Sequence, residues 1–201
     1  DCRFLLENDV KLLIAACGTV SSAAADILEE MPVPAFGVVE PAAKAAVEAT
    51  HSGRIGVIGT SATVRSGAFQ RCITDLRQDV QVIMQACPLF VPLVENGWID
   101  REDPVARGMA ERYLQPLREQ RIDTLILGCT HFPLLTPILS DILGEEVTLI
   151  DSGREAALRC VQLLGERDAL NTAQRQGCCH FYISDRQEDF ARMAAMFLGH
   201  P

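Results

Sequence analysis

Short, continuous apolar runs alternate with amphipathic segments along almost the whole chain, and this rhythm restricts the possible folds strongly. An apolar run without alternation is typical of a strand buried on both faces, as in a parallel sheet. Helical segments between such strands predict βαβ units, so we expect an α/β fold with mainly parallel sheets. The expected strands are Val10–Ala16, Ala35–Val39, Arg54–Gly59, Val80–Gln85, Ile122–Gly128, Val147–Ile150 and Cys179–Ile183. The expected helices are Ser21–Met31, Pro41–His51, Thr63–Leu76, Glu102–Glu119, Pro133–Leu143, Glu155–Leu164 and Gln187–Leu198.

Two of the expected strands resemble each other. When Cys17 is aligned with Cys129, each segment is an apolar strand that ends in a small residue and is followed by Cys, with Thr19 or Thr130 close behind. This similarity, set within the βαβ rhythm, predicts two pseudosymmetric α/β domains that face each other. We expect the first to contain residues 1–38 with 152–201, and the second residues 39–151. The site should lie in the cleft between them, at the carboxyl ends of the strands.

The chain opens with a stretch, residues 1–9, that has helical character and runs directly into a buried strand. We therefore expect an earlier βα unit upstream of it, so that the first domain is incomplete at its N-terminus.

Composition and missing motifs exclude several classes of function. The net charge of −9 disfavours a nucleic-acid partner. The richest apolar stretch, Val82–Val94, is broken by Gln85 and two prolines, so we expect no membrane span. The eight cysteines form no CxxC, which favours reduced thiols in a cytoplasmic protein over a disulfide, redox or metal protein. Dinucleotide, P-loop, HExxH and GxSxG motifs are absent. The two lysines are Lys11 and Lys44, and Lys11 lies at the N-terminal end of its strand, away from the active edge, so we expect no pyridoxal phosphate Schiff base. We expect no cofactor and no metal.

Cys17 and Cys129 are the candidates for chemistry. A Cys between a buried strand and a helix N-terminus lies where the helix dipole favours the thiolate, so we expect a lowered pKa. Most cysteines in soluble proteins are plain core residues, and we interpret the others as structural. Two opposed thiols suit the inversion of a carbon centre, because one removes a proton from one face while the other supplies a proton to the opposite face. The remaining cysteines are Cys2, Cys72, Cys87, Cys160, Cys178 and Cys179.

Four segments, in this order along the chain, resemble bacterial glutamate racemase. They are ACGT at 16–19, RIGVIGT at 54–60 with ATVRSG at 62–67, ACPLFVPLVE at 86–95, and GCTHFPLL at 128–135. The last and the RIGVIGT segment are the most specific. The resemblance implies a cofactor-independent enzyme that interconverts L- and D-glutamate and supplies D-glutamate for peptidoglycan.

The resemblance also implies roles for particular residues. Cys17 and Cys129 fall on the two catalytic positions, and His131 and Glu95 match residues that support the second thiol. The residues that match the substrate surroundings are Gly18, Thr19, Thr63, Thr130 and His131. Glutamate would be the small-molecule partner, and a homodimer is left open.

Two departures from the family pattern leave alternatives open. Gly18 stands where the family usually has Asn, and the family's opening Asp-Ser-Gly and Tyr-Gly segments are expected before residue 1. The Asp-Ser-Gly at 151–153 matches a later segment of the family and fits a strand end with a helix cap. Thr63 also fits a helix cap, and Glu95 also fits a solvated turn. The alternatives are a non-catalytic binding module, an inactive fragment, or a racemase that acts on aspartate or another amino acid.

Overall fold

The computed structural model describes residues 1–173, 177–183 and 187–199, and its strands form two parallel sheets. One sheet has two strands and the other has four, in the order β4-β3-β5-β6. Every pair of neighbouring strands in these two sheets is parallel, which confirms the predicted α/β class. The strands are β1 (Leu13–Ala15), β2 (Ala35–Gly37), β3 (Arg54–Gly59), β4 (Gln81–Ala86), β5 (Thr124–Leu127) and β6 (Thr148–Asp151).

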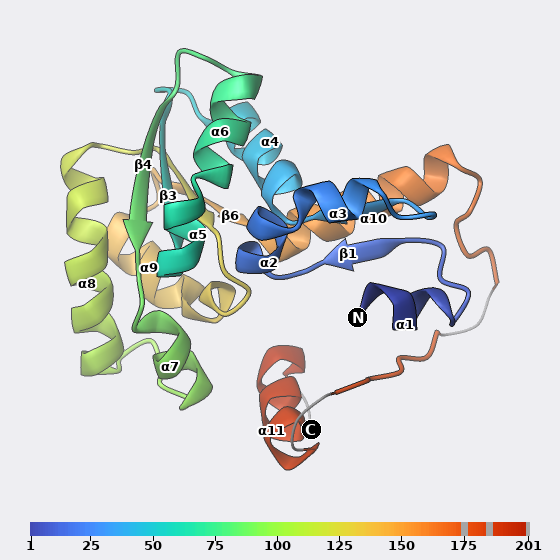
Figure 1. Cartoon of the computed structure of the whole chain (residues 1–201). Helices are drawn as coiled ribbons and strands as arrows, with labels where there is room; N and C mark the ends of the chain where they lie inside the picture. The colour runs from blue at the N-terminus through green and yellow to red at the C-terminus, as the bar shows by residue number, and fades with distance from the viewer. Residues whose placement is uncertain (174–176, 184–186, 200–201) are drawn as a thin grey trace.

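Helices connect the strands and cover both faces of the larger sheet (Figure 1). They are α1 (Cys2–Leu6), α2 (Gly18–Ala23), α3 (Ala25–Glu29), α4 (Val39–Ala49), α5 (Ser61–Ser66), α6 (Ala68–Leu76), α7 (Phe90–Glu95), α8 (Pro104–Glu119), the 3₁₀ helix η1 (Phe132–Leu135), α9 (Thr136–Leu143), α10 (Ser152–Glu166) and α11 (Gln187–Leu198).

The four-stranded sheet separates two hydrophobic clusters. Val57 and Ile126 project toward α4 and α6 on one face, whereas Ile58 and Leu125 project toward α7, α8, η1 and α9 on the other. All four side chains are fully buried, because neighbouring positions of a strand point to opposite faces and helices cover both. Each such side chain contributes about 1.5–3 kcal/mol by leaving water, so this sheet is the main core of the molecule.

The two-stranded sheet is much smaller. Each strand has three paired residues, and α2 and α3 pack beside it. Leu13 is buried but Ile14 is 38% exposed. The unit adjoins the larger sheet where α2 packs against α5, and Figure 1 shows β1 extending away from that junction. The predicted domain boundaries, 1–38 with 152–201 and 39–151, stay a prediction.

One predicted strand is wrong. Residues 177–183 form no strand, and the side chains of Phe181, Tyr182 and Ile183 are 59%, 58% and 41% exposed. The apolar run finds no neighbouring strand within the described chain, and Tyr182 instead packs edge-on against Phe4 of α1. An apolar run alone cannot separate a buried strand from a segment that packs only in part.

Helix boundaries also differ from those expected. The helix predicted over Thr63–Leu76 is divided at Gly67, which has the left-handed φ of 64° and ends α5. The helix α7 is not predicted from the pattern, because Pro88 and Pro92 suggest a loop. Pro92 lies in the first turn of α7, where a missing N–H breaks no helical hydrogen bond.

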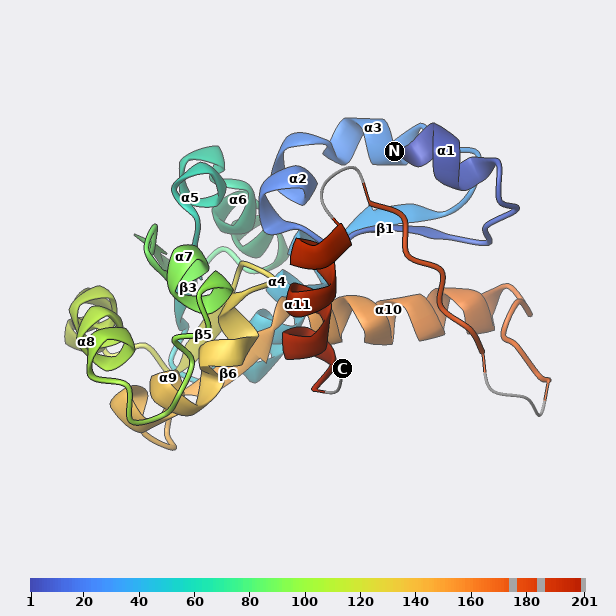
Figure 2. The same ribbon diagram turned by 90° about the horizontal axis from the view of Figure 1, so that it is seen from below.

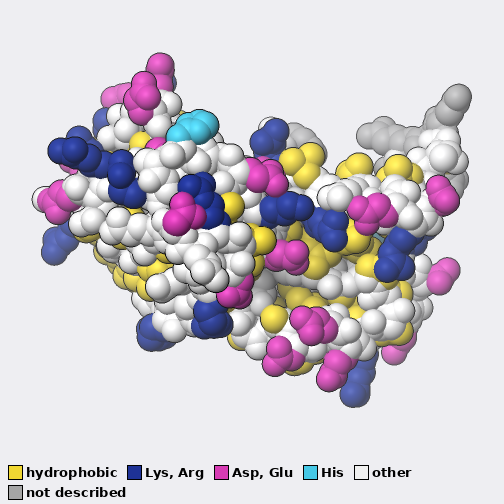
Figure 3. Space-filling model, turned by 90° about the horizontal axis from the view of Figure 1, so that it is seen from above, with side chains coloured by type: hydrophobic (Ala, Val, Ile, Leu, Met, Phe, Trp, Pro, Cys, Tyr) yellow, Lys and Arg dark blue, Asp and Glu magenta, His cyan; other side chains and the backbone are white. Residues whose placement is uncertain are grey.

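Within the described residues, no helix combines the length and the apolar character that a membrane crossing requires. On the face shown in Figure 3, Lys and Arg side chains are interspersed with Asp and Glu side chains.

Candidate active site

The two predicted catalytic cysteines follow the carboxyl ends of β1 and β5. Cys17 is the N-cap residue of α2, and Cys129 lies between β5 and η1. The backbones of these two segments touch at Gly18 and Gly128, and a Cβ atom at position 18 would overlap the Gly128 carbonyl oxygen. A Cβ atom at position 128 would lie 2.8 Å from the Ile58 carbonyl oxygen. Only glycine fits at either place without a shift of the backbone.

A cavity of about 180 Å³ lies between the two segments. Seven of the eight residues predicted for the site line it, and the eighth, Glu95, reaches it through His131. Thr60, Val91 and Gly128 complete the lining. The lining residues are Cys17, Gly18, Thr19, Thr60, Thr63, Val91, Gly128, Cys129, Thr130 and His131.

Cys129, His131 and Glu95 form a relay on one side of the cavity. The Cys129 Sγ atom is 3.8 Å from His131 Nδ1, and His131 Nε2 is 3.2 Å from Glu95 Oε1. An ionised Glu95 accepts a hydrogen bond from Nε2–H, which leaves Nδ1 free to accept the proton of the thiol. The relay therefore supplies Cys129 with a proton acceptor.

The environment of Cys129 disfavours the thiolate, contrary to the expectation from sequence. Cys129 is 7% exposed, and burial raises the pKa of its thiol. Cys17 and Glu95 raise that pKa further, whereas hydrogen bonds from the His131 backbone and the Thr130 side chain oppose the shift. The expectation of a lowered pKa is wrong here because Cys129 precedes a 3₁₀ helix of four residues, whose dipole is short, while desolvation acts on the whole thiol.

Three threonine hydroxyls meet at another wall of the cavity. Thr19 Oγ1 lies 3.0 Å from Thr60 Oγ1 and 3.2 Å from Thr63 Oγ1, and the last two are 3.1 Å apart. Thr60 is the N-cap of α5, and its side chain accepts a hydrogen bond from the Thr63 backbone N–H. Thr63, which is fully buried, is thus not the cap. Sequence reasoning missed Thr60, although a Thr between a buried strand and a helix is a recognisable cap signal.

The surroundings of Cys17 are more open. Its side chain is exposed, and among the described residues no side chain is hydrogen-bonded to its Sγ atom. Its neighbours in the cavity are Thr19 and the glycine backbone at 18 and 128.

The C-terminal helix reaches the relay, which no sequence pattern indicated. The Arg192 side chain donates a hydrogen bond from Nη1 to the Glu95 carbonyl oxygen at 3.1 Å. The Phe197 ring packs edge-on against His131, with ring centroids 5.6 Å apart. Both contacts are tertiary and join segments far apart in the chain.

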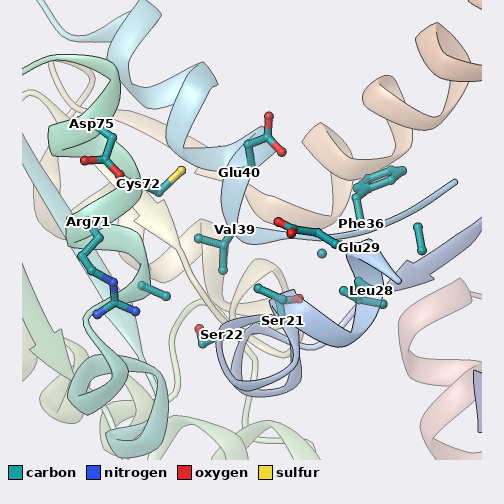
Figure 4. A pocket seen from close by; sticks show the side chains of 14 residues that line it. Ser21, Ser22, Leu28, Glu29, Phe36, Val39, Glu40, Arg71, Cys72 and Asp75 are labelled. Carbon is teal, nitrogen blue, oxygen red and sulfur yellow. The ribbon is translucent and has the colours of Figure 1, made fainter. Parts of the chain in front are cut away.

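A larger cavity of about 440 Å³ lies elsewhere, between α2, α3, α4 and α6 (Figure 4). Its thiol, Cys72, is a poor nucleophile, because burial, Glu40 and Asp75 raise its pKa to about 11. This cavity contains neither predicted catalytic cysteine. The described residues also include no group of three His, Cys, Asp or Glu side chains arranged to hold a metal ion.

Comparisons with known proteins find relatives along nearly the whole chain. The Asp/Glu/Hydantoin racemase family matches residues 2–160. Glutamate racemase of Geobacter metallireducens is 45% identical over 197 residues, which are 98% of this chain and 72% of that protein. The crystal structure of glutamate racemase isoform RacE1 from Bacillus anthracis superposes with a TM-score of 0.91 at 34% identity, covering 98% of this chain and 74% of that one.

A second solved structure carries a bound amino acid. Glutamate racemase from Francisella tularensis, in complex with D-glutamate, has a TM-score of 0.89 at 32% identity, and the match covers 98% of this chain and 73% of that one. The chain described here therefore belongs to the Asp/Glu/Hydantoin racemase family and is similar to glutamate racemases over nearly its whole length.

Proposed function

We propose that this protein interconverts L- and D-glutamate without a cofactor, with Cys17 and Cys129 as its two acid–base groups. The observation that carries the proposal is the cavity lined by both thiols at the contact between their backbone segments. Similar proteins named glutamate racemase, one of them with D-glutamate bound, support glutamate as the substrate. The biological role would be the supply of D-glutamate for peptidoglycan in the cytoplasm, and the homodimer stays a prediction.

The reaction needs two proton transfers at one carbon. In one direction the Cys17 thiolate removes the Cα proton, and the Cys129 thiol delivers its proton to the opposite face. In the other direction Cys129 is the base and Cys17 the acid. Groups of the same chemical type on both faces allow both directions.

The raised pKa of Cys129 fits the first direction directly. Its thiol is protonated at neutral pH, so it is ready to act as an acid. For the reverse direction the thiol must first lose its proton, and His131 Nδ1, 3.8 Å away, is the acceptor. Glu95 then stabilises the imidazolium ion that forms.

The three threonine hydroxyls at the cavity wall are candidates for binding the substrate carboxylate. Thr19, Thr60 and Thr63 present hydroxyls that can donate hydrogen bonds to a carboxylate. Hydrogen bonds to the substrate carboxylate stabilise the negative charge that develops when Cα loses its proton. This stabilisation matters because an amino acid Cα–H is a very weak acid.

The proposal is tested by incubating the full-length protein with L- or D-glutamate in D₂O. We expect deuterium at Cα of the product enantiomer, detected by ¹H NMR and chiral chromatography. A panel with aspartate, alanine and serine then separates glutamate from other substrates. Absence of Cα exchange with glutamate would contradict the proposed activity. Faster exchange with aspartate would show that aspartate, and not glutamate, is the preferred substrate.

A further inference from the structure

The C-terminal helix α11 touches the catalytic relay at two points. Arg192 donates to the Glu95 carbonyl oxygen, and Phe197 packs against the His131 ring with an interplanar angle of 82°. Between them, Met196 packs against the large hydrophobic cluster of the four-stranded sheet. In Figure 2 the helix lies in the foreground, with α7 to its left and α10 to its right.

The Arg192 contact acts on the end of α7. Glu95 is the last residue of this helix, and the carbonyl groups of a last turn lack helical partners. A cation at a helix C-terminus satisfies such a carbonyl and interacts favourably with the helix dipole. The hydrogen bond therefore fixes the backbone of the residue whose carboxylate holds His131.

The Phe197 contact acts on the imidazole ring itself. His131 is contacted by the Cys129 thiol at Nδ1 and by Glu95 at Nε2, and the Phe197 ring meets it edge-on. Edge-to-face contacts at this distance favour one ring orientation. Rotation of the imidazole would break both of its polar contacts, so the aromatic contact preserves the alignment of the relay.

We propose that Arg192 and Phe197 are positioning residues for proton transfer at Cys129. This inference rests on the proposed function and goes beyond it. Both residues act on the His131–Glu95 pair, which serves one thiol and not the other. Their loss should therefore impair the chemistry at one face of the substrate.

One-sided impairment has a kinetic signature. When Cys129 removes the Cα proton, a misaligned His131 slows that step, so C–H cleavage limits kcat/KM more strongly. The Cα-deuterium isotope effect on kcat/KM then rises for the enantiomer that Cys129 deprotonates. For the other enantiomer the isotope effect stays the same or falls, because Cys17 still removes that proton normally and reprotonation becomes slower.

The experiment compares Arg192→Met and Phe197→Leu with wild type in the full-length protein. We expect kcat to fall about fivefold, with KM changed less than twofold, as loss of one hydrogen bond or aromatic contact implies. Arg192→Lys and Phe197→Tyr keep the cation and the ring edge, so they should recover most of the activity. Leu198→Ala removes an exposed apolar side chain from the neighbouring position of α11 and should leave the kinetics unchanged.

Equal isotope effects for both enantiomers, or losses that the conservative variants do not recover, would overturn the inference. Thermal melts of each variant show whether the fold is retained. If wild type fails to exchange Cα–H at all, the proposed function fails instead. The ¹H and ¹⁵N signals of the His131 ring then test the inference separately, since they should move in Phe197→Leu and Arg192→Met and stay fixed in Leu198→Ala.

Discussion

The two thiols lie in very different surroundings, although the sequence around them is similar. Cys129 is buried beside the four-stranded sheet and has a histidine and a glutamate behind it. Cys17 is exposed, follows a strand of three residues, and has threonine and glycine neighbours. Similar local sequence thus gives similar backbone placement, whereas the chemical state of a thiol depends on what the rest of the fold packs around it.

The contrast suggests that the two sides of the cavity differ in mobility. The Cys129 segment follows a strand of a sheet that is covered on both faces, so we expect it to be the more rigid of the two. The Cys17 side depends on a small sheet with a partly exposed strand, and such regions open with less free energy than a core does. We therefore expect substrate to enter through movement of the Cys17 side.

The largest effect is expected from removing either thiol. Cys17→Ser and Cys129→Ser should each lower kcat by about 10²- to 10⁴-fold, because a hydroxyl is a far weaker acid than a thiol. Steady-state assays in both directions measure the loss. Cys87→Ser, which alters a buried structural thiol outside the cavity, is the control. Normal racemisation by either active-site variant would show that the two sides are not a catalytic pair.

The difference in packing is tested by truncating one core side chain in each sheet. Ile126→Ala removes a fully buried side chain from β5 and should cost about 2–5 kcal/mol in the free energy of unfolding. Ile14→Ala in β1, where the side chain is 38% exposed, should cost less than about 1 kcal/mol. Urea denaturation gives both values. Similar losses would mean that the small sheet is as well packed as the large one.

Thiol alkylation compares the accessibility of the two cysteines. At pH 8, iodoacetamide should modify Cys17 at least about tenfold faster than Cys129, since the thiolate is the reactive form and burial raises the pKa of Cys129. Labelling of Cys129 should then increase as pH rises toward its pKa. Cys72, with its pKa of about 11, is roughly one part in a thousand thiolate at pH 8 and serves as the slow reference. Peptide mass spectrometry follows each site, and faster labelling of Cys129 would contradict the prediction.

The smallest effect is expected at the end of the relay. Glu95→Gln keeps the shape but loses the charge that stabilises His131, so kcat should fall about three- to tenfold. The side chain is half exposed, which limits the effect through solvent screening. Glu111→Gln, an exposed position on α8, is the matched control. An unchanged kcat in both directions would show that Glu95 takes no part in catalysis.

Much of the fold could be predicted because its main signal is local. The expected strand Arg54–Gly59 agrees with β3, where every position is buried or nearly so and the apolar run is uninterrupted. The expected Val10–Ala16 shortens to Leu13–Ala15, because pairing there ends with the short partner β2. The segment 179–183 has an apolar run like that of a strand but no neighbouring strand among the described residues, and only tertiary structure decides pairing.

The candidate site also has a part that the local sequence displays and a part that depends on tertiary structure. The cysteines, Thr19 and Thr130 could be selected by their position after apolar strands, which the sequence displays, whereas His131 and Glu95 rest on the family resemblance. Thr60 could have been predicted by the same reasoning, since it also follows an apolar strand. The direction of the Cys129 pKa shift and the contacts of Arg192 and Phe197 were out of reach, because desolvation and packing depend on segments distant in the chain.

The glycine contact between positions 18 and 128 has a consequence for how such a protein changes over time. The closest approach between the two cysteine-bearing segments is made by backbone atoms of Gly18 and Gly128, and the nearest side-chain atom to a Cβ built at position 18 is Thr63 Oγ1, at 3.6 Å. We therefore expect substitutions among the side chains of the cavity lining to change the shape of the cavity more than the separation of these two segments. Any replacement of Gly18 by a larger residue would require a shift of the backbone at position 18 or at Gly128.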